Sequence, residues 1–289
     1  MCPEPFDELR TAPVEGHKPA LRQAQRPYRT WRPRLVALDI DGTLVDRNGW
    51  LPRTVAEAVG LVVQARVPVV LATGRSWHGT QPLFEELGLP PGPTVCSNGA
   101  VVVRYPPQEI IKAITFDPRP VITQVEAFAP GTLIAVEEIG RGYRLNDRFP
   151  GNDLTGELII ESAEQLSSRP VTRVILRDPT RSEEEFVALA RHLGMHGVTY
   201  YIGWGDWLDI APDGVNKATA LAEVAAGFGV PAADVLAFGD GRNDIEMLRW
   251  AGRGVAMGDA PDEVKVAADD VTETIDGGGP AVELHHWFG

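Results

Sequence analysis

Cysteine is scarce in this sequence: Cys2 and Cys96 are the only two among 289 residues. Two thiols allow one disulfide at most, and a reduced, cytoplasmic compartment is the simpler interpretation. The sequence also lacks any uninterrupted apolar run approaching the ~20 residues of a membrane-spanning helix. Its start, at residues 1–10, carries acidic residues and no apolar segment, so we expect neither a membrane anchor nor a signal peptide.

Positive charge is also limited, because 27 Lys and Arg stand against 40 Asp and Glu, for a net charge of −13. Nucleic-acid binding needs clustered basic residues, so we expect no nucleic-acid partner. A small phosphorylated molecule held through a cation remains compatible with this charge. With 44% hydrophobic and 23% charged residues, the composition is that of a soluble globular protein. The length allows two domains, or one domain with an insertion, and leaves monomer and homodimer open.

The chain opens with a proline-rich stretch, residues 1–33, which shows no sustained periodicity and is expected to be a disordered tail. A pattern of strand, helix, strand, helix, strand follows up to residue 100. Its apolar strands are expected at 34–40, 67–72 and 94–97, with helices from Pro52 and over 77–87. This pattern is typical of a doubly wound parallel sheet in an α/β fold.

The predicted pattern of secondary structure changes over residues 101–202. There, alternating strand-like segments and two predicted helices, 121–128 and 183–193, indicate an inserted α+β domain. The doubly wound pattern then resumes over 203–289. There we expect a strand at 207–210, helices at 217–228 and 243–250, a strand at 235–239 and a last sheet strand at 254–257. The core domain is therefore predicted to comprise 34–100 and 203–289.

The stretch that carries the clearest chemistry is Asp39-Ile40-Asp41-Gly42-Thr43-Leu44, directly after the apolar run Leu35-Val36-Ala37-Leu38. Ligands of open α/β sheets bind beyond the carboxyl ends of such strands. Two acids at this place are not needed by a buried strand, so they indicate a site.

Polar residues recur at equivalent places in the chain. Further clusters follow strands or begin helices: Thr73-Gly74-Arg75, Lys217, and Asp240 with Asn243 and Asp244. Carboxylates that converge in one cleft repel each other unless a cation joins them. Hard oxygen ligands without a nearby His or Cys pair favour Mg²⁺ over zinc. One carboxylate can then act as nucleophile in phosphoryl transfer, and a second can move the proton.

With these motifs in place, the chain resembles the haloacid-dehalogenase superfamily, and within it the Cof-like (type IIB) phosphatases, which carry a large α/β cap domain. The matching stretches are DIDGTL at 39–44, ATGR at 72–75, SNGA at 97–100, LDIAPDGVNKATAL at 208–221, GDGRNDIEML at 239–248 and AMGDAPDEVKVAAD at 256–269. They occur in the family's order and spacing over the whole core. The resemblance implies a Rossmann-like core with residues 101–202 as the cap.

The resemblance also implies roles for individual residues. Asp39 would be the nucleophile that forms an aspartyl-phosphate, and Asp41 the general acid and base. Mg²⁺ would be held by Asp39, the backbone carbonyl of Asp41, Asp240 and Asp244. Asp244 is also explained as an acid favoured by a helix N-terminus. Lys217 would steady Asp39 and the phosphate.

The phosphate side of the site is implied in the same way. Thr73 and the Gly74 amide would bind the phosphoryl group, and Asn243 would contact it. Arg75 and Asn98 match motif positions and are assigned substrate-side or supporting roles. The chain departs from the family at Asp259, where the family usually has Asn, and the tail 1–33 has no counterpart.

We therefore predict a cytoplasmic, Mg²⁺-dependent phosphomonoester hydrolase that acts on a small phosphorylated metabolite. Sugar phosphates are the favoured substrate class, with pyridoxal or flavin phosphates as further candidates. The sequence leaves two alternatives open: a sugar phosphomutase, and a non-catalytic phosphate-binding regulatory protein on the same fold. The cap selects the substrate in this family, and residues 101–202 match the family only in their pattern of strands and helices.

Overall fold

The computed structural model of the chain describes residues 31–151, 154–178, 180, 182, 185, 198–202 and 207–289. The predicted tail 1–33 and the predicted helix 183–193 lie almost entirely outside these residues. Residues Pro33–Gly289 form one compact unit, and no helix among its described residues is both long and apolar enough to cross a membrane.

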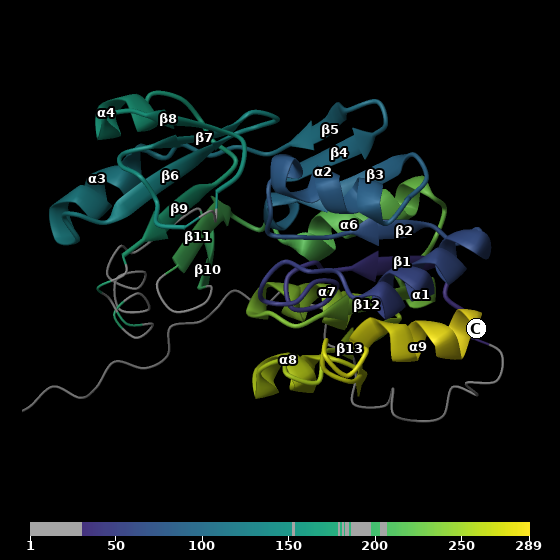
Figure 1. Ribbon diagram of the computed structural model, residues 1–289. Helices are drawn as coiled ribbons and strands as arrows, with labels where there is room; N and C mark the ends of the chain where they lie inside the picture. The colour runs from purple at the N-terminus through teal and green to yellow at the C-terminus, as the bar shows by residue number, and fades with distance from the viewer. Residues whose placement is uncertain are drawn as a thin grey trace, which may run out of the picture. The chain divides into compact units, whose positions relative to one another are not determined.

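Within the described residues, a parallel sheet has the order β14-β13-β12-β1-β2 (Figure 1). Its strands are β1 (Leu35–Leu38), β2 (Val69–Leu71), β12 (Val235–Gly239), β13 (Arg253–Ala256) and β14 (Asp270–Val271). All four residues of β1 have no exposed surface, as expected for the central strand of a sheet covered on both faces. The chain runs outward from β1 in both directions, so the order of the strands reverses there.

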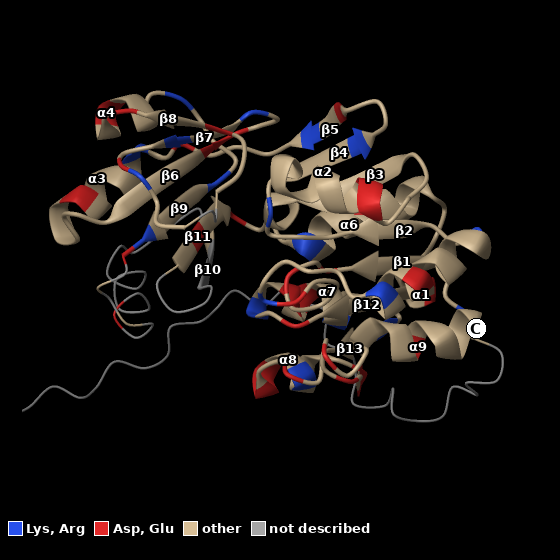
Figure 2. Ribbon diagram, viewed as in Figure 1, with Lys and Arg blue, Asp and Glu red and all other residues tan. Residues whose placement is uncertain are grey.

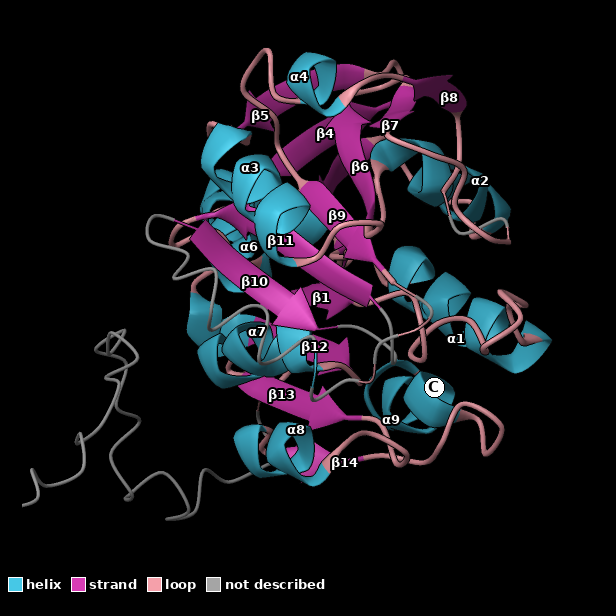
Figure 3. Cartoon of the chain, turned by 90° about the vertical axis from the view of Figure 1, so that its left-hand side faces the viewer, coloured by secondary structure: helices cyan, strands magenta, loops and turns pink. Residues whose placement is uncertain are grey.

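Helices cover both faces of this sheet, with α1 and α9 on one side of β12 and β13 and α7 and α8 on the other (Figure 3). Their bounds are α1 (Arg53–Gln64), α2 (Trp77–Glu86), α6 (Lys217–Gly227), α7 (Ile245–Trp250), α8 (Asp262–Ala267) and α9 (Gly279–Phe288). Short 3₁₀ turns are η1 (Ser97–Gly99), η2 (Ala232–Asp234) and η3 (Arg242–Asp244). The fold is the α/β, doubly wound arrangement expected from the sequence.

The cap sheet, defined here as β10-β11-β9-β6-β7-β8, is mostly antiparallel. Its strands are β6 (Leu133–Glu138), β7 (Gly142–Leu145), β8 (Glu157–Ile160), β9 (Val174–Arg177), β10 (Val198–Ile202) and β11 (Trp207–Pro212). Helices α3 (Arg119–Phe128) and α4 (Ala163–Leu166) pack on one face through apolar residues that include Val121, Ile122 and Leu166.

Strand pairing corrects three details of the sequence interpretation. The strand expected at 207–210 as part of the core is β11, and it pairs with β9 and β10 of the cap sheet. The strands β4 (Val101–Tyr105) and β5 (Glu109–Ala113), expected in the inserted domain, extend an antiparallel sheet from β3 (Gly92–Cys96). Strand β13 is not the last, since β14 pairs with it. We propose a division into a core and a cap domain. By sheet membership, its two boundaries lie near residues 114 and 212.

Candidate active site

The acidic residues follow neighbouring strands of the core sheet. Asp39 comes directly after β1 and Asp240 directly after β12, and these two strands pair in parallel with Leu38 beside Phe238. The Asp39 amide continues this pairing by donating to the Phe238 carbonyl over 3.1 Å. Because parallel strands end at the same edge, the two carboxylates are placed side by side.

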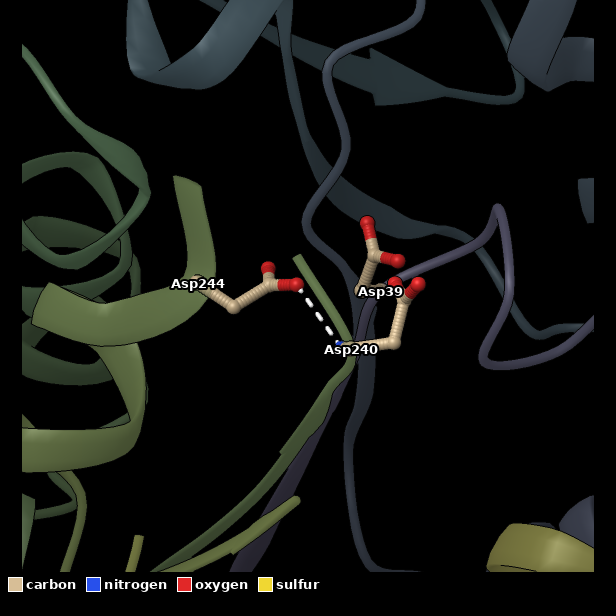
Figure 4. A group of neighbouring side chains, drawn as sticks. All are labelled: Asp39, Asp240 and Asp244. Atoms are coloured by element: carbon tan, nitrogen blue, oxygen red, sulfur yellow. Dashed lines mark hydrogen bonds between the residues drawn. The ribbon is translucent and has the colours of Figure 1, made fainter. Parts of the chain in front are cut away.

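Asp39, Asp240 and Asp244 form a carboxylate cluster whose oxygens approach within 4.8 Å of one another. Figure 4 shows the side chains of Asp39 and Asp240 turned the same way, while Asp244 reaches toward them from the start of α7. Asp244 Oδ2 accepts the backbone N–H groups of Asp240 at 3.0 Å and Gly241 at 2.9 Å. Asp244 therefore also holds the loop that carries Asp240 in place.

Lys217 bridges the cluster. It opens helix α6, which begins with a capping box in which Asn216 accepts the Thr219 amide at 2.9 Å. The lysine side chain has no exposed surface, and Nζ donates to Asp39 Oδ1 and to Asp244 Oδ1, each over 2.6 Å. A helix start fixed in this way aims one buried cation between two carboxylates.

The electrostatics of the cluster show an excess of negative charge. Burial, the Asp244 charge and the Asp41 charge raise the pKa of Asp39 to about 7, although Lys217 opposes them. Burial and the charges of Asp39 and Asp244 raise the pKa of Asp240 to about 9. Burial alone would lower the pKa of Lys217, but Asp244 and Asp39 outweigh it and raise that pKa. One lysine does not neutralise three carboxylates.

The turn after Asp39 depends on Gly42, which has φ +79°. Its amide donates to the Val45 carbonyl over 3.0 Å, and the Leu44 amide to the Ile40 carbonyl over 2.8 Å. A Cβ atom on Gly42 would lie within 2.6 Å of Asp240 Cγ. The glycine is therefore required twice, by the left-handed backbone and by the close approach of a cluster carboxylate.

Asp41 pairs with an arginine outside the carboxylate cluster. Its carboxylate accepts Arg75 Nε at 2.9 Å and Arg75 Nη2 at 2.6 Å, and 58% of its side chain is exposed. The carboxylate of Asp41 is thus a bidentate partner of Arg75. Arg75 was expected to have a substrate-side or supporting role, and its observed contact is with the residue expected to move the proton.

The remaining predicted residues meet on another side of the site. The Thr73 hydroxyl, fully buried, accepts the Arg75 amide at 3.0 Å. Asn243 Nδ2 donates to Asn98 Oδ1 over 2.9 Å. A Cβ on Gly74 would lie 3.3 Å from Asn98 Oδ1 and 3.6 Å from Asn243 Nδ2, so these three residues are neighbours. The structure therefore gathers the residues expected to bind phosphate.

Two cap residues that contact this site, Glu137 and Arg173, were not predicted from the sequence. Arg173 donates through Nη1 to the Gly74 carbonyl, and Glu137 accepts the Ser97 hydroxyl at 2.7 Å. The available signal was a single charged residue, Arg173, inside the apolar segment 171–176. A buried strand tolerates a charge only where it has a partner.

Comparison with known proteins agrees with this geometry. The profile of the haloacid dehalogenase-like hydrolases matches residues 36–284. Pyridoxal phosphate phosphatase YbhA of Escherichia coli is 31% identical over 267 residues, 84% of this chain and 96% of the relative. The 5-amino-6-(5-phospho-D-ribitylamino)uracil phosphatase YitU of Bacillus subtilis is 29% identical over 271 residues, covering 89% and 98%. The solved structure of the HAD subclass IIB sugar phosphatase BT4131 superposes with a TM-score of 0.75 at 24% identity, covering 87% of this chain and 98% of that one.

Proposed function

Since the chain belongs to the haloacid dehalogenase-like hydrolases as a phosphatase of the Cof-like branch, we propose that it hydrolyses phosphomonoesters of small metabolites with Mg²⁺ through an aspartyl-phosphate on Asp39. The observation that carries the proposal is the carboxylate cluster of Asp39, Asp240 and Asp244, bridged by buried Lys217. The site residues and the cofactor named below are parts of this proposal.

The carboxylate cluster fits a hard divalent cation. Its donors are all oxygens, lie within 4.8 Å of one another and come from two strand ends and a helix start. Burial and then repulsion between the carboxylates raise the pKa values of Asp39 and Asp240, and a cation would relieve the repulsion. The backbone carbonyl of Asp41 is proposed as a further ligand. Bound Mg²⁺ would neutralise charge on the phosphoryl oxygens and orient them for attack.

Asp39 is the proposed nucleophile. Its Oδ1 is held by Lys217 Nζ at 2.6 Å, which fixes the carboxylate while Oδ2 attacks phosphorus. Attack forms the Oδ2–P bond and breaks the bond between phosphorus and the ester oxygen. Water then attacks the same phosphorus, releases inorganic phosphate and regenerates the carboxylate.

Asp41 is the proposed proton carrier. It would give a proton to the departing ester oxygen and take one from the attacking water. In the structure its carboxylate is bound by Arg75, so turnover requires Asp41 to exchange this guanidinium for the ester oxygen. Thr73, the Gly74 amide, Asn98 and Asn243 would bind the transferred phosphoryl group.

The favoured substrate class remains the sugar phosphates. Two relatives are named a pyridoxal phosphate phosphatase and a phosphoribitylamino-uracil phosphatase. These keep a pyridoxal and a ribityl phosphate as competing candidates. The compartment proposed is the cytoplasm, in keeping with the buried free thiol of Cys96.

The decisive experiment measures phosphate release from a panel of metabolite phosphates and from p-nitrophenyl phosphate, with Mg²⁺ and with EDTA. Asp39→Asn keeps the shape of the nucleophile and removes its charge, so we expect a loss of order 10³-fold or more. Asp46→Asn is the matched control, because Asp46 accepts the backbone amides of Asn48 and Trp50 in the next loop, and an amide oxygen can replace it. Full activity of the Asp39 variant would refute the assignment of Asp39 as the nucleophile.

The two alternatives have separate outcomes in the same assay. A phosphomutase would convert a sugar 1-phosphate into the 6-phosphate without releasing phosphate. A non-catalytic phosphate-binding protein would show no turnover on the whole panel. In that case Mg²⁺ with beryllium fluoride, which mimics the phosphoryl group only when bonded to a reactive aspartate, is expected to leave the melting temperature unchanged.

A further inference from the structure

One face of the cap sheet is apolar, and the other carries buried charged residues beside a second apolar cluster. Side chains alternate along each strand, and one set packs against α3 and α4 in an apolar cluster. The opposite face carries Glu137 on β6 and Asp209 on β11, with Arg173 directly before β9 contacting both. Figure 2 shows acidic and basic positions interspersed around β6, β7 and β9. The three charged residues Glu137, Arg173 and Asp209 therefore need a structural explanation.

These charges are buried, which is costly unless they are paired. Arg173 and Glu137 are each 4% exposed. Arg173 donates through Nη2 to the Tyr143 hydroxyl and lies 3.6 Å from both Glu137 Oε2 and Asp209 Oδ2. Both 3.6 Å separations exceed hydrogen-bond distance, and Arg173 Nε has no hydrogen-bond partner. The ion pairs within the cap are thus long, although Arg173 also bonds Tyr143 and Glu137 Oε2 accepts the Thr172 hydroxyl at 3.3 Å.

Arg173 and Glu137 also form hydrogen bonds with the core. Arg173 Nη1 donates to the Gly74 carbonyl, and Glu137 Oε2 accepts the Ser97 hydroxyl at 2.7 Å. The two cap residues are joined to each other, since the Glu137 amide donates to the Arg173 carbonyl over 3.2 Å. One rigid pair of cap residues therefore reaches two core loops at once.

Those two loops form the phosphate side of the site. The Ser97 amide donates to the Arg75 carbonyl over 2.9 Å, and the Asn98 amide to the Thr73 carbonyl over 3.0 Å. The Arg75 amide donates to the Thr73 hydroxyl over 3.0 Å. The peptide group between Gly74 and Arg75 is thus held at its N–H end by the core and at its carbonyl end by the cap.

We propose that Arg173, supported by Glu137, is a positioning residue that sets the geometry of the phosphate-binding loop 73–75 when the cap is docked on the core. It acts through the Gly74 carbonyl and would touch neither the phosphoryl group nor the cation. Cap docking and phosphate binding are then coupled, because the loop has its full set of hydrogen bonds only in the docked arrangement. This inference rests on the proposed phosphatase site at Asp39.

The test replaces the forked donor while keeping its charge. Arg173→Lys leaves a cation beside Glu137 and Asp209 but lacks the planar pair of N–H groups that reaches Tyr143 and Gly74 together. A charge-assisted hydrogen bond of this kind corresponds to about 10- to 100-fold in an equilibrium. We expect kcat/KM for p-nitrophenyl phosphate to fall by that factor and the inhibition constant of inorganic phosphate to rise.

Two readouts separate positioning from a general loss of structure. The shift in melting temperature caused by Mg²⁺ alone is expected to stay at its wild-type size, because the cation contacts other residues. The matched control is Arg144→Lys, a cap arginine of similar burial whose contacts with Glu138, Glu161 and the Gln165 carbonyl all lie within the cap. That variant is expected to lower the melting temperature and leave the phosphate inhibition constant unchanged.

A wild-type inhibition constant in the Arg173 variant overturns the inference, as does an equal change in the Arg144 control. If Arg173→Lys does not fold, Ser97→Ala cuts the second link between cap and core. A raised phosphate inhibition constant in that variant supports the coupling, and an unchanged one refutes it. Failure of the proposed function itself has another signature, since wild-type protein would then release no phosphate with Mg²⁺.

Discussion

Replacing Gly42 with alanine tests whether the turn after Asp39 holds in place the carboxylates that we propose bind Mg²⁺. The residue has φ +79°, and an added Cβ would overlap the carboxylate of Asp240, lying within 2.6 Å of its Cγ. Gly49 supplies a matched control in the same connection, because it has φ +77° and an added Cβ would meet nothing within 4 Å. The two alanine variants therefore share the backbone strain and differ in the overlap.

The expected magnitudes follow from these two effects. A left-handed conformation costs an L-residue about 1–2 kcal/mol, which corresponds to a fall of roughly 2–8 °C in melting temperature for a chain of this size. Both variants should show it. Gly42→Ala must in addition displace Asp240, and a misplacement near 1 Å in an active site costs about 100-fold in rate.

The assay measures the melting temperature with and without Mg²⁺, together with kcat/KM for p-nitrophenyl phosphate. Gly49→Ala is expected to keep the Mg²⁺-induced shift and to stay within about twofold of wild-type activity, since its Cβ contacts nothing. Gly42→Ala is expected to lose most of the shift and about 100-fold in kcat/KM. Equal Mg²⁺ shifts and equal activities in the two variants would refute the placement of Asp240 as a ligand held by this turn.

Two further perturbations address charge in the cluster. Lys217→Met leaves Asp39 and Asp244 buried without their shared cation. Breaking such a buried ion pair is expected to lower the free energy of unfolding by about 3–5 kcal/mol. Urea denaturation in EDTA measures this loss, and an unchanged urea midpoint would contradict it. Mg²⁺ affinity is expected to rise with pH, because Asp39 and Asp240, with pKa values of about 7 and 9 in the metal-free protein, must lose their protons to bind the cation. Both pKa values exceed the ordinary value of 3.8, so the folded metal-free protein holds protons that the unfolded chain releases, and its free energy of unfolding falls as pH rises toward 9. Titrating Mg²⁺ against melting temperature at pH 6 and pH 8 checks the affinity, and equal affinities at the two pH values would contradict it.

The sequence by itself determined the fold class and the family, and it indicated the residues of the proposed site. Local patterns were sufficient for this, because an apolar run such as Leu35–Leu38 is buried in almost any sheet that contains it. The acids Asp39 and Asp240 each follow such a run, so their meeting at one sheet edge follows from parallel pairing alone. Lys217 was indicated by the motif LDIAPDGVNKATAL at 208–221 and by the family resemblance, because a lysine at a helix start is by itself most often solvent-exposed.

Tertiary structure decided which partner each side chain takes. Strand β11 fits either sheet by its local pattern, and its pairing with β9, some thirty residues away, assigns it to the cap. The Asp41 carboxylate binds Arg75, and Arg173 reaches Gly74 across 99 residues. Periodicity reports whether a side chain is buried, but hydrogen bonds and ion pairs depend on distances set by the packing of distant segments. The sequence therefore indicated the chemistry of the site, while the contacts between cap and phosphate loop emerged only from the fold.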